Sequence, residues 1–300
     1  MILIKRIVNY TRVSLKKSLR DVMKSKNRMI AGIYSPAVFS LDYEEVEYKS
    51  IDGKKLYAWL IKNENAKKTI VLCHGRFNNR IFLLKFLRIF VETKLNEKYN
   101  ILLPDLRNSG MSEVSKTALG YFFSYDIYSS LKYLKDEYGY NNFTLYGFSQ
   151  GAMGASLVPT LFENELEEEK IIIEKMILDS PVSNVRKLII KNSYIGKIRL
   201  PYFLIIAAIN QFNRFIDNKL EILRLSKTLG RVDTLIIQSE KDEVTPYEML
   251  IYEYNKLDEY SKSKTKFKAF RKGQHVRIYL QYKEEYTKEI KDFLEGEENE

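Results

Sequence analysis

Hydrophobic positions along most of the chain follow two alternating patterns. Short runs such as Ile70-Val71-Leu72 and Leu235-Ile236-Ile237 are apolar throughout, as in strands of a parallel sheet that is covered on both faces. Longer stretches between them carry apolar residues at helical spacing, which predicts helices near 80–95, 122–138, 150–162, 246–257 and 277–294. The alternation predicts a doubly wound α/β fold with helices on both faces of the sheet. Its strands are expected at Tyr43–Tyr48, Leu56–Ile61, Thr69–Cys73, Asn100–Pro104, Phe143–Tyr146, Lys175–Leu178, Thr234–Gln238 and Lys266–Phe270.

One interval interrupts this alternation. More than fifty residues separate the strand that ends at Asp179 from the next strand, although a crossover connection can be as short as about a dozen residues. We therefore expect residues 184–230 to form a helical cap, or lid, over an α/β core made of residues 36–183 and 231–300. Residues 1–35 are expected to form a separate basic helical segment.

The net charge of +10 is concentrated in two segments. Residues 1–30 hold nine basic residues against one acidic residue, and residues 184–230 hold nine against two. A single cysteine excludes an internal disulfide. The uncharged run Leu200–Asn213 is shorter than the roughly 20 apolar residues that span a membrane, and no signal-peptide pattern follows the first residues. We therefore expect a cytoplasmic protein.

A G-x-S-x-G motif directly follows the expected strand Phe143–Tyr146. It reads Gly147-Phe148-Ser149-Gln150-Gly151 and opens a helix rich in small residues. A nucleophile elbow requires this context, because its serine occupies a strained turn and the two glycines, Gly147 and Gly151, allow strand and helix to pack closely. The motif predicts that Ser149 is a nucleophile.

A base and an acid for this serine follow it in the sequence. His275 comes after the last expected strand, and Asp242 comes after the one before it. The order Ser, Asp, His is that of the α/β-hydrolase triad, and each residue would lie at the carboxyl end of a different strand. The acid remains open at this point. Glu240, Glu243 and Asp179 are rivals, and Asp242 is favoured because it lies shortly before Pro246, where the next helix can begin.

The loop after the strand Thr69–Cys73 predicts an oxyanion hole. Its sequence, His74-Gly75-Arg76, occupies the position that supplies the second amide donor in this fold class. The backbone N–H groups of Arg76 and Gln150 are therefore the expected pair. His74 itself is expected to brace the loop rather than to catalyse.

These motifs together resemble bacterial α/β-hydrolases that group with serine aminopeptidases, cinnamoyl esterases and prolyl-oligopeptidase-like peptidases. The resemblance implies an eight-stranded, mostly parallel sheet and a Ser-His-Asp triad. Asn108 and Ser109 depart from it, since they replace the usual Gly-His of a D-x-R-G-H-G loop, and Thr234 stands where proline is common. The matching segments are Leu41–Val46, Asp52-Gly53, His74-Gly75, Asn79-Arg80, Asp105–Ser112, Gly120, Asp126, Gly147–Gly151, Asp179-Ser180-Pro181, Asp242 and His275.

Three functions are compatible with the sequence. The favoured one is hydrolysis of a carboxylic ester or thioester through an acyl-enzyme, without a cofactor or a metal. An aminopeptidase-type peptidase ranks lower, because it needs acidic residues for the substrate ammonium and the expected cap is basic. That basic charge would instead suit an anionic small-molecule substrate. A non-catalytic binding protein on the same fold is the third, and no motif for nucleic-acid recognition accompanies the basic segments.

The basic segment at the start of the chain supports a further hypothesis. Apolar residues recur at mostly helical spacing among lysines and arginines: Ile4, Ile7 or Val8, Leu15, Leu19, and Val22 or Met23. Such a helix could lie on an anionic membrane surface as a peripheral contact. Alternatively, the same apolar stripe could pack on the core or on a second subunit. Burial of the stripe decides between these alternatives.

Overall fold

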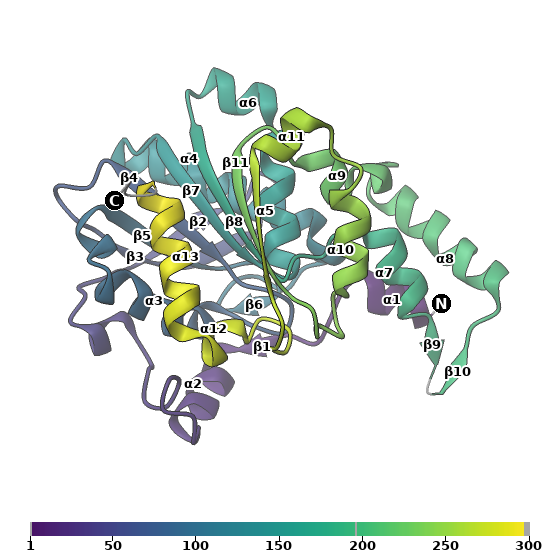
Figure 1. Cartoon of the computed structure of the whole chain (residues 1–300), viewed down its shortest axis with the longest axis horizontal. Helices are drawn as coiled ribbons and strands as arrows, with labels where there is room; N and C mark the ends of the chain where they lie inside the picture. Colours follow the sequence, from purple (N-terminus) through teal and green to yellow (C-terminus); the bar gives the residue numbers. More distant parts are fainter. Residues whose placement is uncertain (1, 196, 297–300) are drawn as a thin grey trace.

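The computed structural model describes residues 2–195 and 197–296 and is centred on one eight-stranded sheet (Figure 1). Its strand order is β12-β11-β8-β7-β4-β5-β3-β2, and every neighbouring pair is parallel except β5–β3 and β3–β2. The predicted mostly parallel sheet is confirmed, with each predicted strand boundary within three residues of the observed one. The strands are β2 (Glu44–Lys49), β3 (Lys55–Ile61), β4 (Lys68–Cys73), β5 (Tyr99–Asp105), β7 (Asn142–Phe148), β8 (Ile172–Asp179), β11 (Asp233–Ser239) and β12 (Thr265–Phe270).

Helices cover both faces of this sheet, and each face has its own apolar core. One core holds side chains of α3 and α13, and the other holds those of α4, α5 and α10. The helix predicted at 277–294 is two helices, because the backbone at Tyr282 has non-helical φ and ψ of −124° and 47°. The helices of the α/β core are α3 (Arg80–Glu92), α4 (Tyr121–Tyr138), α5 (Gln150–Leu161), α6 (Glu163–Glu168), α10 (Tyr247–Tyr254), α11 (Glu259–Ser263), α12 (Ile278–Gln281) and α13 (Lys283–Glu295). Short 3-10 turns are η2 (Leu95–Glu97) and η3 (Ala118–Gly120).

Residues 184–230 leave the sheet after β8 and return to it at β11. They extend to one side of the sheet, where α8 lies beside the N-terminal helix α1 (Figure 1). Asn184 starts the segment as a helix cap, since its side-chain oxygen accepts from the N–H of Lys187. No helix in the described part of the chain is long and apolar enough to cross a membrane. The segment contains α7 (Val185–Lys191), β9 (Tyr194–Ile195), β10 (Ile198–Arg199), α8 (Tyr202–Phe215), η4 (Leu220–Ile222) and α9 (Leu225–Thr228).

The basic N-terminal segment forms two short helices instead of one continuous stripe. Ile7 and Val22 are buried, and Ile4, Leu15 and Leu19 are partly buried against the two apolar cores. Apart from Met23, which is 73% exposed, the apolar side on which a membrane contact would depend is thus covered by the protein itself. The segment contains α1 (Ile2–Val8), β1 (Val13–Ser14) and α2 (Leu15–Met23), with β1 paired in parallel to the two-residue strand β6 (Ser109–Gly110), and η1 (Pro36–Phe39) follows it.

Candidate active site

Ser149 occupies a strained turn between β7 and α5. Its φ of 55° lies in the left-handed region, which side chains rarely adopt. The flanking glycines make the turn possible: a Cβ at Gly147 would lie 2.5 Å from the Cα of Ala152, and one at Gly151 would lie 2.2 Å from the carbonyl oxygen of Cys73. The turn therefore holds the serine side chain out from the carboxyl edge of the sheet, as a nucleophile elbow requires.

Ser149, His275 and Asp242 form one row of hydrogen bonds. The Nε2 atom of His275 lies 2.8 Å from Ser149 Oγ, and its Nδ1 atom lies 2.7 Å from Asp242 Oδ2. The three residues follow β7, β12 and β11, so three strand ends bring together positions that are far apart in the sequence. This geometry suits proton transfer from the serine to the imidazole, with the carboxylate holding the imidazole ring.

The Asp242 carboxylate is fixed by its own hydrogen bonds. Its Oδ1 accepts from the N–H groups of Val244 and Thr245, each at 2.9 Å, and Gln238 and the Thr245 hydroxyl donate to Oδ2. Burial alone would raise the pKa of Asp242, but the hydrogen bonds and the nearby His275 outweigh it and lower that pKa below its usual value. Asp242 therefore stays ionised beside the imidazole.

The rival acids lie elsewhere. Asp179 is fully buried, and its carboxylate accepts from the hydroxyls of Tyr286 and Ser180 rather than from His275. Glu240 and Glu243 are exposed to solvent. Of the four candidates, the structure places only Asp242 against His275.

The two expected oxyanion donors flank Ser149. Gln150 is the first residue of α5, where backbone N–H groups have no partner within the helix. Arg76 follows β4 in a loop so close to the serine that a Cβ at Gly75 would lie 2.9 Å from Ser149 Cβ. His74 is buried and braces this loop: its Nδ1 donates to Gly75 O, and its Nε2 accepts from Leu106 N. The role of the Arg76 and Gln150 amides stays a prediction.

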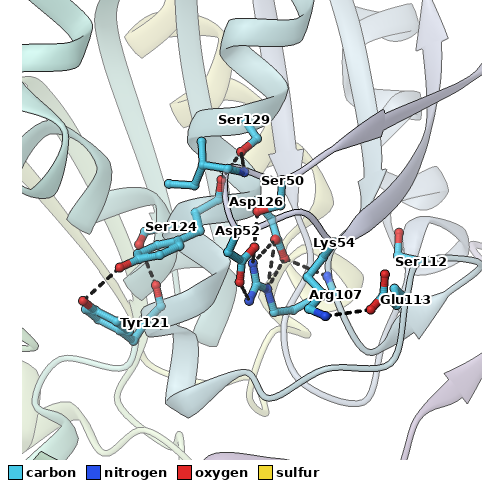
Figure 2. A network of polar contacts seen from close by, with 12 residues as sticks. Ser50, Asp52, Lys54, Arg107, Ser112, Glu113, Tyr121, Ser124, Asp126 and Ser129 are labelled. Carbon is cyan, nitrogen blue, oxygen red and sulfur yellow. Dashed lines mark hydrogen bonds and ion pairs between the residues drawn. The ribbon is translucent and has the colours of Figure 1, made fainter. Parts of the chain in front are cut away.

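A buried ion pair fixes the neighbouring loop of residues 105–112. Figure 2 shows the Arg107 guanidinium between two carboxylates, with Nη2 donating to Asp126 at 2.7 Å and Nη1 donating to Asp52 at 2.8 Å. Arg107 and Asp126 are both almost fully buried. The next two residues, Asn108 and Ser109, contact the N-terminal segment.

A cavity of about 960 Å³ opens over Ser149 and His275. Its lining contains the N-terminal segment, the loop after β4 and helix α7, and we call it the active-site pocket. Its lining residues are Lys5, Arg6, Ile7, Asn9, Tyr10, Thr11, Arg76, Phe77, Leu119, Ser149, Gln150, Val182, Leu188, Ile189, Asn192, Val244, Thr245 and His275.

The sequence reasoning did not place the N-terminal segment in this site. The only signal was the departure of Asn108 and Ser109 from the D-x-R-G-H-G pattern. Both side chains contact the N-terminal segment: Asn108 Nδ2 donates to Asn9 Oδ1 and Tyr10 O, and Ser109 Oγ lies 2.8 Å from the Tyr10 hydroxyl. Within the described residues, no three His, Cys, Asp or Glu side chains are grouped to hold a metal ion.

Comparison with known proteins agrees with this fold. A family model for the alpha/beta hydrolase fold matches residues 68–204. The Pyrococcus furiosus esterase Pf2001 is 25% identical, with a TM-score of 0.65 over 88% of this chain and 95% of that one. Two further esterase structures share the fold, and each aligns over 83% of this chain and 98% of its own. One is the Exiguobacterium antarcticum esterase, with 20% identity and a TM-score of 0.54. The other is Butyrivibrio proteoclasticus Est1E with bound ferulic acid, with 18% identity and a TM-score of 0.60. No protein with a curated description matches the sequence. The chain therefore has the α/β-hydrolase fold.

Proposed function

We propose that this protein hydrolyses carboxylic esters, or thioesters, through an acyl-enzyme on Ser149. The observation that carries the proposal is the row Ser149–His275–Asp242, with contacts of 2.8 and 2.7 Å, at the floor of an open pocket. Similarity to solved esterases supports ester hydrolysis as the reaction class.

In the proposed reaction, Ser149 Oγ attacks the ester carbonyl while His275 Nε2 accepts the hydroxyl proton. Asp242 keeps the Nδ1 proton of His275 in place and stabilises the imidazolium. The amides of Gln150 and Arg76 would bind the oxyanion of the tetrahedral intermediate. His275 then protonates the leaving alcohol or thiol. In the second half, His275 accepts a proton from water, the hydroxide attacks the acyl-serine, and Ser149 regains its proton as the acid departs.

The lining of the active-site pocket favours an ester over an aminopeptidase substrate. A peptidase of that type must bind a substrate ammonium, and a carboxylate would have to line its pocket. The pocket lining within the described residues contains Lys5, Arg6 and Arg76 but no Asp or Glu. Apolar side chains of α7, Leu188 and Ile189, would contact the substrate chain instead.

Activity-based labelling tests the proposal. A fluorophosphonate probe is expected to modify wild-type protein at Ser149 and to leave Ser149→Ala unlabelled. A panel of p-nitrophenyl esters, acyl-CoAs and aminoacyl anilides then separates esterase, thioesterase and peptidase activity. Folding of Ser149→Ala is checked by its thermal unfolding curve. Absence of both labelling and hydrolysis would contradict the proposed function and favour a binding protein on this fold.

A further inference from the structure

The N-terminal strap, defined here as residues 2–14, is tied to the loops around the active site. Arg76 lies in the predicted oxyanion loop, and its Nη2 donates to the carbonyl oxygens of Arg6 and Asn9, both at 2.8 Å. From the other side, Asn108 Nδ2 donates to the carbonyl of Tyr10 at 2.8 Å. The strap is thereby held at the edge of the active-site pocket through its backbone carbonyl groups.

Two buried side chains also hold the strap against the core. Ile7 and Tyr10 are only 6% and 8% exposed, and the Tyr10 hydroxyl bonds to Ser109. Burial also raises the pKa of Tyr10 to about 12, so this hydroxyl stays neutral. The N–H of Thr117 donates to Val8 O, and β1 pairs with β6. The strap is therefore an ordered wall of the pocket.

This wall is positively charged and has no acidic partner. Lys5, Arg6 and Arg76 line the pocket, and no ion pair joins any of them to a carboxylate in residues 2–195 and 197–296. The Nε atom of Arg76 is buried without a hydrogen-bond partner there. The nine cations of residues 184–230, which the sequence suggested for substrate binding, are all absent from this lining. The relevant charge comes from the strap and the oxyanion loop.

A second cavity, which also contains His275 in its lining, is lined mainly by positively charged side chains. Its volume is about 570 Å³, and it shares Val244 and His275 with the active-site pocket. Lys241, Lys272 and Arg277 line it against a single carboxylate, Glu243. Positive groups that surround a cleft attract anions and raise their local concentration.

We propose that the strap selects esters that carry a negatively charged group, a carboxylate or a phosphate, beyond an apolar stretch next to the scissile bond. This inference rests on the proposed esterase function and names its substrate class. Ser149 and His275 supply the reaction, and Leu188 and Ile189 contact the apolar stretch. Lys5 and Arg6 bind the anionic end, and the charge of Arg76, whose Nη2 holds the strap, adds to the positive potential of the pocket.

Two matched substrate pairs test this selectivity and separate the sources of the charge. Mono-4-nitrophenyl suberate and 4-nitrophenyl octanoate have acyl chains of equal length and differ in a terminal carboxylate. Octanoyl-CoA and octanoyl-N-acetylcysteamine differ in the phosphates of the leaving group. The quantity measured is the ratio of kcat/KM within each pair. We expect wild-type protein to prefer the charged member of at least one pair by about tenfold, and the pair that responds identifies the anion.

Matched variants then locate the selectivity. The double variant Lys5→Gln/Arg6→Gln is expected to lose most of the preference for the charged substrate. Because Arg6 also donates to Tyr194 O in residues 184–230, the double variant removes a structural contact as well as charge. The single variant Lys5→Gln keeps that contact and is expected to lose part of the preference. Lys16→Gln/Arg20→Gln removes the same charge from exposed positions outside the pocket and should keep the preference. Raising the ionic strength from about 0.02 to about 0.3 M should narrow the wild-type preference.

The outcomes separate this inference from the proposed function. Equal kcat/KM values within both pairs would overturn the inference while leaving the esterase function in place. The same conclusion follows if the Lys5/Arg6 variant keeps the full preference, or if the Lys16/Arg20 variant loses as much. If none of the four substrates is turned over and Ser149 is not labelled, the proposed function itself fails.

Discussion

The floor and the walls of the active-site pocket are built in different ways. We call the floor Ser149 and His275, which line the pocket, together with Asp242, which contacts His275; all three follow the ends of sheet strands. Ser149 and Asp242 are only 7% and 4% exposed. The walls come from the N-terminal strap and α7, which lie outside the sheet and present exposed cations such as Lys5.

In the proposed function, this difference assigns catalysis to the floor and substrate selectivity to the walls. Strand ends in a close-packed sheet have little freedom, so the floor keeps one geometry. The walls lie outside the sheet, so we expect that their exposed side chains, such as Lys5, can change without moving the floor. Substitutions in the floor should therefore affect every substrate, whereas substitutions in the walls should change the ranking of substrates.

The largest effect is expected for Asp242→Asn in the floor. An amide in place of the carboxylate would favour the wrong tautomer of His275, and kcat should fall about 10⁴-fold for all esters. Asp217→Asn, at an exposed position, is the matched control. A similar kcat for both variants would contradict the claim that the floor residues carry the chemistry.

The same variant has a pH signature. Because the pKa of Asp242 is lowered in the folded state, its ionised form stabilises the fold above the unfolded pKa, and this contribution disappears as the pH falls through the folded pKa. Wild-type protein should therefore lose more unfolding free energy than Asp242→Asn between neutral pH and about pH 3. Urea unfolding at both pH values measures this difference, and parallel losses would contradict it.

The next largest effect is expected at the loop that joins floor and walls. Arg107→Met leaves the buried Asp126 and the partly buried Asp52 without their cation, which should lower the free energy of unfolding by about 3–5 kcal/mol. Lys54→Met breaks the more exposed ion pair with Glu113 and should cost about 0–1 kcal/mol. Equal losses in urea unfolding would show that the buried network does not anchor this loop.

A smaller effect is expected in the wall formed by α7. Leu188 lines the active-site pocket, so Leu188→Ala should reduce the preference for octanoyl over acetyl p-nitrophenyl esters by about tenfold. Ile190→Ala is the control, because Ile190 lies on the same helix and packs on the core without lining the pocket. The chain-length profile of kcat/KM measures the effect. A profile that shifts equally in both variants would contradict a direct contact.

The smallest effect is expected at the attachment of the strap. Asn108→Gly removes the side-chain amide that bonds to Asn9 and Tyr10, while glycine tolerates the φ of 61° at this position. The loss of these bonds, about 1 kcal/mol, should raise the rate of tryptic cleavage after Arg6 and Arg12 severalfold. Asn65→Gly, in an exposed turn, should not change that rate. An unchanged rate in Asn108→Gly would mean that other contacts hold the strap.

The sequence alone predicted the sheet and the members of the floor. Continuous apolar runs marked central strands such as β4 and β11, because strands buried on both faces carry few polar residues, whereas the edge strands β2 and β12 also carry exposed charged residues. The motif Gly147–Gly151 was recognisable because the strained turn requires glycines at fixed positions. His275 was recognisable because the sequence has only two histidines and His74 was expected to brace a loop. Asp242 could only be favoured over Asp179, Glu240 and Glu243, since a choice among these acids depends on which side chain reaches the imidazole.

Only the tertiary structure decided which of the two basic segments contributes charge to the active-site pocket. Their net charges are nearly equal, yet Lys5 and Arg6 line the active-site pocket and the cations of residues 184–230 do not. The periodicity of residues 1–30 indicated an apolar stripe but not what covers it, and the helix breaks where Asn9 and Tyr10 meet Asn108. Hydrophobic spacing records that a face is buried. Long-range contacts determine the partner against which it is buried, and these contacts join positions about one hundred residues apart.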